Sequence, residues 1–306
     1  MSAGPDRKTL IVVTGPTASG KTALAIELAR HFGTEIISAD SRQIYRDIPI
    51  GTAAPSAAEL AMVRHHLIGT LPLDAYYSAA MFEQDALSLL DDIFSRADYA
   101  VVCGGSMMYV DALTRGIDDM PTVSPEVRQR VRDLYETHGA EGLAALLEIT
   151  DPDYWARVDR ANTRRVMHAL EISMQAGVPY STLLTGARRE RPFRTVKMMI
   201  GHTREALFDR INRRTDAMIA GGLIDEARAL LPMRHLNSLN TVGYKEMFAC
   251  FDGLMDLSTA TARIAKNTRV YAKKQLTWLR RDPDIITLDP AAPFPAALEA
   301  IERAVR

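Results

Sequence analysis

The stretch "VVTGPTASGKTALAIELA", residues 12–29, places a glycine-rich loop between an apolar run and a helical pattern. It satisfies G-x-x-x-x-G-K-[ST], a pattern whose backbone N–H groups and following helix N-terminus bind phosphate oxygens. The lysine neutralises the phosphate, and the last hydroxyl, on Thr22, can bind Mg²⁺. Most such loops bind ATP or GTP, but the pattern alone does not specify a nucleotide. The predicted phosphate-binding residues are Gly15, Pro16, Thr17, Ala18, Ser19, Gly20, Lys21 and Thr22.

Short apolar runs recur along the chain with helical segments between them. Such runs are typical of buried parallel strands, and their alternation with helices predicts an α/β fold. We expect a doubly wound parallel sheet of the P-loop kinase-like type, with an inserted all-helical lobe and with ligands at the carboxyl ends of the strands. The predicted strands are residues 9–15, 34–40, 99–105, 195–202 and 284–289.

The inserted lobe is predicted between the third and fourth strands, where the apolar spacing is helical. Ser124 before Pro125 predicts a helix start, and Gly139 and Gly177 predict helix ends. A crossover between parallel strands needs little more than one helix, so the excess is expected to act as a lid or substrate clamp. The predicted domains are a P-loop core of residues 1–117 and 186–306, with the basic C-terminal helices, and a helical insertion of residues 118–185.

The bulk properties favour a soluble globular protein. The 306 residues are 47% apolar, and no run of about 18 apolar residues could span a membrane. The net charge of −1 gives no general attraction to polyanions, so a nucleic-acid partner would need a local basic surface. Cys103 and Cys250 suit neither a disulfide framework nor a metal site, which predicts buried thiols in a reducing compartment. We expect a cytoplasmic protein without a membrane partner. We also expect a monomer, because no sustained heptad is present.

Polar groups follow the second and third predicted strands. Asp40 ends the second strand, where a carboxylate could bind Mg²⁺, act as a general base or cap the next turn. Ser41, Arg42 and Gln43 follow directly, and they either read a polar heterocycle or form a solvated turn. Ser106 follows two glycines after the third strand, so its hydroxyl is expected at the same edge of the sheet.

Arg210 and Arg214 lie four residues apart in a helical pattern and therefore project from one face. A pair of guanidinium groups suits a diphosphate better than a single lysine does. An equally open alternative is that the two arginines lie on a solvated helix face and pair with Asp209 or Asp216.

A concentrated basic surface is predicted on the helical pattern over residues 261–281, which contains no acidic residue. Tyr271 and Trp278 are interleaved with its cations, and binding of a phosphate backbone is the natural use of such a surface. A second basic cluster lies at residues 188–194, and the histidines show no metal-ligand spacing. The basic residues of the helical pattern are Arg263, Lys266, Arg269, Lys273, Lys274, Arg280 and Arg281.

Together these residues resemble the tRNA dimethylallyltransferase family, also called tRNA isopentenyltransferases. The resemblance implies transfer of a dimethylallyl group from dimethylallyl diphosphate to the exocyclic N6 amine of the adenosine 3′ of the anticodon. It implies tRNAs that read codons beginning with U, contact with the anticodon stem-loop, and a requirement for Mg²⁺. The resemblance is collinear over nearly the whole chain, in "GPTASGKT", "DSRQIY", "IGTAAPS", "HHLI", "CGGSMMY", "NTRRVMHALE", "GLIDEARAL", "VGYKE" and "KKQLTWLR".

The resemblance also implies roles for the matching residues. Asp40 would deprotonate the attacking amine, and the phosphate-binding loop would hold the diphosphate with Thr22 on the magnesium. One or both of Arg210 and Arg214 would bind the diphosphate, and Ser106 would complete the catalytic set. The residues expected to contact tRNA are Asp40, Ser41, Arg42, Gln43, Ser106, Arg128, Arg164, Arg165 and His168, to which the basic helix adds Lys273 and Lys274.

Three positions depart from the family pattern. Ser106 stands where a threonine is usual and retains the hydroxyl. Ala54 stands where a lysine is usual, so no cation is available there. His168 stands where an arginine is usual, which weakens the tRNA contact expected at that position.

Two other classes of function use the same loop. A small-molecule or nucleoside kinase would bind ATP and Mg²⁺ on the same fold, and it would need groups that hold an adenine ring. A non-catalytic RNA-binding switch would use the loop only to sense a nucleotide. A prenyltransferase instead needs an apolar pocket for the five-carbon chain.

Overall fold

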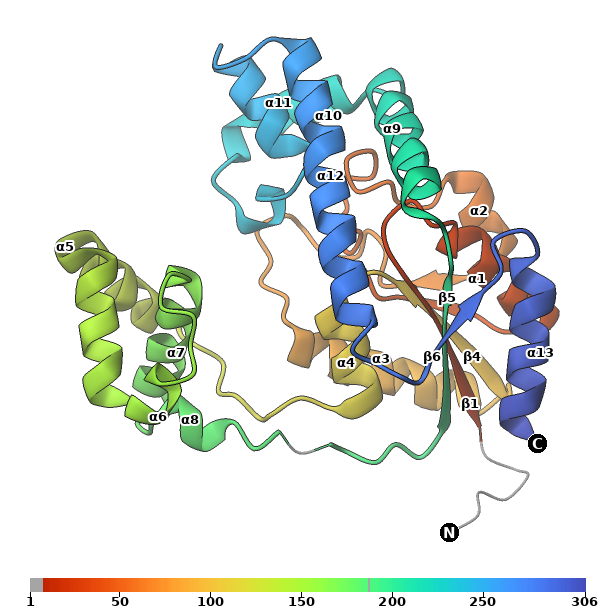
Figure 1. Cartoon of the computed structure of the whole chain (residues 1–306), viewed down its shortest axis with the longest axis horizontal. Coiled ribbons are helices and arrows are strands. Elements are labelled where there is room, and N and C mark those ends of the chain that lie inside the picture. The colour runs from red at the N-terminus through yellow and green to blue at the C-terminus, as the bar shows by residue number, and fades with distance from the viewer. Residues whose placement is uncertain (1–7, 187) are drawn as a thin grey trace. The chain divides into compact units, whose positions relative to one another are not determined.

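The computed structural model describes residues 8–186 and 188–306 and divides into two compact units. The core unit comprises Met1–Arg115 and Glu190–Arg306, and the helical unit comprises Gly116–Arg189 (Figure 1). The insertion predicted at residues 118–185 falls inside the helical unit. Residues 1–7 and 187, which the predicted core domain included, lie outside the described residues.

The core unit is built on a six-stranded sheet with the order β3-β2-β4-β1-β5-β6, and every pairing is parallel. This confirms the predicted fold class. All residues of the central strand β1 are buried, because helices cover both faces of the sheet. The strands are β1 (Thr9–Thr14), β2 (Ile36–Ser38), β3 (His65–His66), β4 (Tyr99–Gly104), β5 (Arg194–Ile200) and β6 (Ile285–Leu288).

The edge strand β3 is absent from the sequence-based prediction. It pairs with β2 through two histidines only, too few residues to create an apolar period. His66 is held by a 2.6 Å hydrogen bond between its Nε2 and a carboxylate oxygen of Glu35. The ordinary structural role expected for these histidines therefore includes closing this edge of the sheet.

The two faces of the sheet carry separate apolar cores (Figure 1). One core packs β1 and β5 against two helices that lie far apart in the sequence, α1 (Lys21–His31) and α13 (Pro293–Val305). The other packs β1, β2 and β4 against α3 (Ala79–Phe94) and α4 (Met107–Arg115). Burial on both faces fixes the direction of β1 and thereby the position of the loop that follows it.

A third core joins the segment after β2 to the C-terminal helices. Tyr244 is its largest fully buried side chain and packs among Ile44, Ile48 and Leu223. The helical pattern predicted over residues 261–281 is confirmed as part of α12, whereas the pattern predicted over residues 204–231 is divided at two glycines into α9, α10 and η1. The elements of this region are α2 (Ala57–Met62), α9 (Arg204–Ala220), α10 (Leu223–Ala229), η1 (Leu231–Met233), η2 (Asn237–Leu239), α11 (Tyr244–Phe251) and α12 (Leu257–Leu279).

The helical unit contains no strand among its described residues, as the sequence predicted. Ser124 caps its first helix by accepting a hydrogen bond from the Val127 N–H, and Pro125 occupies the first turn. Gly139 has φ 65° and interrupts that helix, and Gly177 ends a later one with φ 71°. The helices are α5 (Pro125–Thr150), α6 (Pro152–Trp155), α7 (Thr163–Ala176) and α8 (Tyr180–Leu183).

Asp151 joins two short helices of the helical unit. Its side chain is fully buried, and its two carboxylate oxygens accept hydrogen bonds from the backbone N–H groups of Tyr154 and Ser181, at 3.0 and 2.7 Å. Asp151→Ala should therefore destabilise this unit by about 2 to 4 kcal/mol, because two charge-assisted bonds are lost. Hydrogen exchange over residues 152–183 measures the effect. The exposed Asp153→Ala is the matched control, and equal exchange in the two variants would contradict this account.

Candidate active site

The phosphate-binding loop leaves β1 and enters α1 through backbone conformations that favour glycine. Gly15 has φ 142° and Gly20 has φ 95°, values that L side chains rarely adopt. Ala18 is also left-handed, with φ 64°, and such strain is typical of a functional loop. The first-turn N–H groups of α1 have no partner within the helix and point toward the space in front of the loop.

The loop is held from outside by side chains that bond its backbone. Arg210 Nε donates to the Ala18 carbonyl at 2.7 Å, and His202 Nε2 forms a 2.8 Å bond with the Ser19 carbonyl. Lys21 Nζ donates to the Pro16 carbonyl at 2.7 Å. These three bonds occupy the carbonyl oxygens of Pro16, Ala18 and Ser19. Fewer partially negative oxygens of the loop are therefore free to repel an anion.

A cavity of about 400 Å³ opens in front of this loop. Ser19 Oγ is buried and has no hydrogen-bond partner among the described residues, although it lines the cavity. A buried hydroxyl without a partner marks a place where a ligand oxygen or an ion completes the site. The cavity is lined by Ala18, Ser19, Gly20, Lys21, Thr22, Ala23, Glu59, Arg210, Arg213 and Arg214.

The donor set of this cavity fits Mg²⁺ bound together with a phosphate. The hydroxyls of Ser19 and Thr22 are hard oxygen donors on its wall. Among the described residues no group of three or more His, Cys, Asp and Glu side chains could hold a metal. Mg²⁺ usually keeps several waters and binds through one or two protein oxygens plus substrate phosphates, so a larger protein cage is not required.

Lys21, Arg214 and Asp40 are brought together beside the loop. The pKa of Lys21 is lowered to about 8, mainly by burial and also by the charge of Arg214, whereas electrostatic interaction with Cys103 and with Asp40 opposes the shift. Burial likewise lowers the pKa of Arg214, and the Asp40 charge partly offsets that effect. Arg214 keeps its proton at neutral pH because the guanidinium is a very strong base. Two cations and one carboxylate therefore share a poorly solvated site.

The carboxyl ends of β2 and β4 are locked to each other. Ser106 Oγ accepts a 2.8 Å hydrogen bond from the Ser41 N–H and donates to Ser41 Oγ at 3.1 Å. A methyl group on Gly104 would collide with the Ala39 carbonyl, so only glycine permits this approach. The predicted meeting of these strand ends is present.

Asp40 forms a local cap as well as facing the cations. Its Oδ1 accepts hydrogen bonds from the backbone N–H groups of Arg42 and Gln43, at 2.9 and 3.3 Å. Within the described part of the chain, no hydrogen bond to Oδ2 is present. The capping bonds thus hold the carboxylate in one orientation and leave its second oxygen for a substrate.

The side chains after Asp40 organise neighbouring loops. The Arg42 guanidinium donates to the Asn237 carbonyl at 2.9 Å, and the Gln43 amide donates to the Thr52 and Ala53 carbonyls at 3.2 and 3.1 Å. Arg214 Nη2 also donates to the Thr52 carbonyl, at 3.3 Å. Neither Arg210 nor Arg214 forms an ion pair with Asp209 or Asp216 among the described residues; Arg210 is exposed and bonds the loop, and Arg214 is partly buried.

Comparison with known proteins agrees with the family resemblance of the sequence motifs. The family model described as IPP transferase matches residues 43–282. The tRNA dimethylallyltransferase 2 of Parabacteroides distasonis is 50% identical over 281 residues, which cover 92% of this chain and 94% of that protein. The tRNA dimethylallyltransferase 1 of Phocaeicola vulgatus is 51% identical over 282 residues, with 92% and 94% covered.

This chain belongs to the IPP transferase family. Membership confirms the resemblance seen in the motifs and the predicted function, prenyl transfer to adenosine in tRNA by a tRNA dimethylallyltransferase. Among solved structures, the tRNA isopentenylpyrophosphate transferase of Bacillus halodurans is 34% identical, with a TM-score of 0.68 over 97% of this chain and 95% of that one. A eukaryotic dimethylallyltransferase described as acting on tRNA gives a TM-score of 0.80 at 27% identity, over 96% and 78%.

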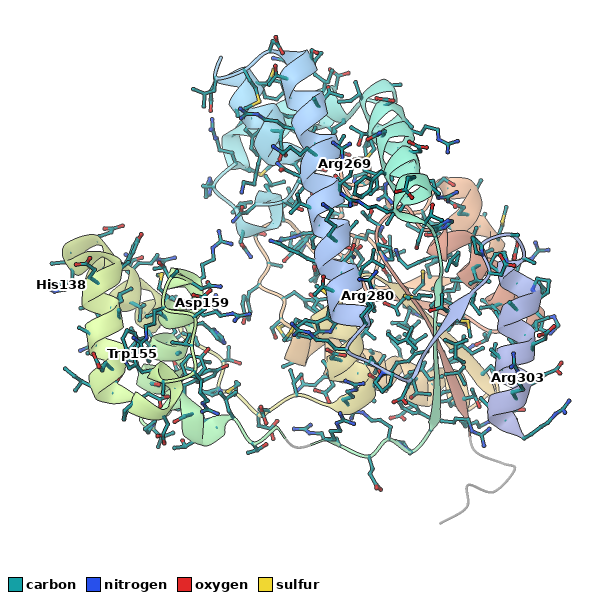
Figure 2. All side chains as sticks on the ribbon, in the orientation of Figure 1. His138, Trp155, Asp159, Arg269, Arg280 and Arg303 are labelled. Carbon is teal, nitrogen blue, oxygen red and sulfur yellow. The ribbon has the colours of Figure 1, made fainter. Side chains whose placement is uncertain are left out.

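In this IPP transferase the cations of α12, and of the two residues that follow it, are not neutralised by carboxylates among the described residues. Among the described residues, none of the seven cations predicted on residues 261–281 forms an ion pair. Figure 2 shows Arg269 on this helix and Arg280 directly after its last residue. Lys273 and Lys274 are exposed, as a surface for a phosphate backbone requires.

The other residues expected to contact tRNA lie in the helical unit. Arg164 and Arg165 are exposed in the first turn of α7, which Asn162 caps through the Arg165 N–H. His168 lies on the same helix and is exposed as a residue, but partial desolvation of its imidazole, and then the charge of Arg128, lowers its pKa. The imidazole is therefore mostly neutral near pH 7, which accords with a weaker RNA contact than the usual arginine provides.

The sequence does not predict several residues of the site. His202 and Arg213 come with no motif, although the first holds the loop and the second lines the cavity. Glu226 accepts bonds from the N–H groups of Ile50 and Gly51, at 2.9 and 2.8 Å, and thereby positions the loop that bonds Arg214. Glu226 belongs to the motif "GLIDEARAL", but the sequence of this motif does not predict which backbone groups the glutamate binds.

The pKa of Lys21 makes anion binding depend on pH. Below about pH 8 its ammonium form predominates in the folded protein, and above that pH the neutral amine does. We expect the affinity for inorganic diphosphate, divided by that of Lys21→Arg, to fall up to about tenfold per pH unit above pH 8. Titration calorimetry from about pH 7 to about pH 9.5 measures this ratio, in which the ionisation of diphosphate itself cancels. A ratio constant with pH would show that Lys21 stays charged.

Proposed function

We propose that this enzyme transfers a dimethylallyl group from dimethylallyl diphosphate to the N6 amine of the adenosine 3′ of the anticodon, in tRNAs that read U-initial codons. The observation that carries the proposal is the position of Asp40. Its negative charge lies close enough to Lys21 and Arg214 to change the pKa of both, so a base and an anion site adjoin. Such a juxtaposition suits a reaction in which an amine loses a proton while a diphosphate departs.

Asp40 is assigned the role of general base. The exocyclic amine of adenine is a poor nucleophile because its lone pair is delocalised into the ring. A carboxylate that takes the proton as the new C–N bond forms removes this obstacle. The capping bonds to Oδ1 fix the carboxylate, and Oδ2 is the oxygen assigned to the amine proton.

The departing diphosphate is assigned to the cavity in front of the loop. Lys21, Arg210 and Arg214 line it and supply positive charge, and the first-turn N–H groups of α1 donate hydrogen bonds. Thr22, together with Ser19, would hold Mg²⁺, which when bound neutralises charge on the leaving diphosphate. Partial burial strengthens these interactions, because little water competes for the same oxygens.

The tRNA is assigned to the basic surface of α12 and to the helical unit. The target base must leave the anticodon stack, at a cost of a few kcal/mol, to reach Asp40. Contacts of Lys273, Lys274 and the helical unit with the RNA backbone would offset this cost. We further propose that the protein acts as a monomer in the cytoplasm; none of its described helices is long and apolar enough to cross a membrane.

Transfer of label tests the function. The protein is incubated with Mg²⁺, unmodified tRNA and dimethylallyl diphosphate labelled in the prenyl group, and a parallel reaction contains labelled ATP and nucleosides. We expect label in the tRNA at the adenosine 3′ of the anticodon and no phosphoryl transfer. Absence of label in the tRNA, together with ATP turnover on a nucleoside, would establish a kinase instead.

Substitution of Asp40 separates catalysis from RNA binding. Asp40→Ala should lower kcat by about 10² to 10⁴-fold, the usual contribution of a general base, with a modest loss of tRNA affinity. Single-turnover kinetics and filter binding measure the two quantities. Asp47→Ala, an exposed carboxylate of the same segment, is the matched control. Wild-type turnover in Asp40→Ala would rule out the assigned role and favour a non-catalytic RNA-binding protein.

Charge reversal on α12 tests the RNA surface. Lys273→Glu with Lys274→Glu should weaken tRNA binding and flatten the dependence of log Kd on log salt concentration, because fewer counterions are released. Binding titrations at several salt concentrations measure the slope. Arg303→Glu with Arg306→Glu changes the same charge at the end of α13, where both arginines form i,i+4 pairs, and should leave the slope unchanged. An unchanged slope in the α12 variant would remove this helix from the RNA interface.

A further inference from the structure

Gln275 is a buried polar side chain inside the basic helix. It follows Lys273 and Lys274 in α12, yet it is 2% exposed, whereas the two lysines face solvent. The cations of "KKQLTWLR" are assigned to RNA binding, whereas the amide of Gln275 has no role in that surface. A buried carboxamide is costly unless its groups are bonded, so its partners indicate what it does.

The Gln275 amide bridges two loops of the active site. Its Oε1 accepts a 3.0 Å hydrogen bond from the Thr17 N–H in the phosphate-binding loop. Its Nε2 donates to the Gly105 carbonyl at 2.8 Å, one residue before Ser106. The loop after β1 and the loop after β4 are thus joined through one side chain that comes from a third element.

The surroundings leave the bridge little freedom. A methyl group on Gly105 would collide with Gln275 Nε2 and would lie 3.2 Å from the Gly15 carbonyl. The next residue, Leu276, packs with Ala18 of the loop in a small apolar cluster with α9. A side chain on Gly105 or movement of α12 would therefore displace the phosphate-binding loop.

We propose that Gln275 is a positioning residue that fixes the phosphate-binding loop relative to Ser106 and Asp40. The Thr17 N–H points to Gln275 and away from the cavity, so this bond sets the orientation of the peptide that precedes Ala18. The leaving diphosphate and the amine base are held by different loops, and prenyl transfer requires that their separation be maintained. A displacement of about 1 Å between reacting groups can cost about 10²-fold in rate.

The inference rests on the proposed prenyl transfer, and substitutions of Gln275 test it. Gln275→Met keeps the volume and removes both bonds; we expect kcat to fall about 10 to 100-fold and the affinity for inorganic diphosphate to weaken. The tRNA affinity should stay at the wild-type value, because Lys273 and Lys274 are retained. Thr261→Ala, at the other end of α12, is the control for the helix. A loss confined to thermal stability or to tRNA affinity would overturn the proposal.

Gln275→Glu provides a readout that a purely structural role would not give. A protonated carboxyl group can accept from the Thr17 N–H and donate to the Gly105 carbonyl, whereas a carboxylate repels that carbonyl. Its kcat relative to wild type should therefore rise as pH falls, while the corresponding ratio for Gln275→Met stays constant. A flat ratio for both variants would contradict a role for the donated bond.

Failure of the two proposals can be told apart. Wild-type protein that transfers no prenyl label to tRNA would refute the function, whatever the Gln275 variants do. In that event the affinity of the Gln275 variants for inorganic diphosphate still tests whether Gln275 positions the phosphate-binding loop. Weaker binding by Gln275→Met than by Thr261→Ala would support the positioning role, and equal binding would overturn it.

Discussion

The phosphate-binding loop is held in place by hydrogen bonds to its outward-facing peptide groups. Arg210 and His202 bond the carbonyls of Ala18 and Ser19, and Gln275 bonds the Thr17 N–H. Each of these side chains comes from a segment beyond β4 in the chain, so the geometry of the loop depends on residues that are distant in sequence. The cavity, the cation cluster and the position of Asp40 all depend on this arrangement.

Electrostatics in the site is organised around one carboxylate and several cations with limited access to water. Lys21 and Arg214 are destabilised as cations by burial, and an incoming diphosphate would remove that penalty. Asp40 is the carboxylate that accompanies them, and its cap bonds come from its own backbone segment. Because Lys21 is buried, binding a strongly negative leaving group stabilises its ammonium form more than it would at the surface. A prenyl diphosphate and a nucleotide share this strong negative charge.

The sequence predicts the elements with a strong local pattern and misses those that depend on tertiary contacts. The loop, the apolar strands and the caps at Ser124 and Gly177 carry local signals, and all are present. Strand β3 has two residues, so no period can reveal it. Gln275 and His202 are ordinary polar residues until the fold places them beside the loop, about 180 to 260 residues away in sequence. The roles of the site residues remain predictions drawn from the family pattern and the geometry.

The assignment of a leaving diphosphate to this loop makes a definite statement about which bond breaks. Dimethylallyl diphosphate with ¹⁸O in the oxygen that joins carbon to phosphorus reports that bond. If carbon is attacked by the adenosine amine, mass spectrometry will find the ¹⁸O entirely in the released diphosphate and a prenylated nucleoside free of phosphorus. Recovery of the ¹⁸O in dimethylallyl alcohol, with phosphorus on the acceptor, would show attack at phosphorus and contradict the account.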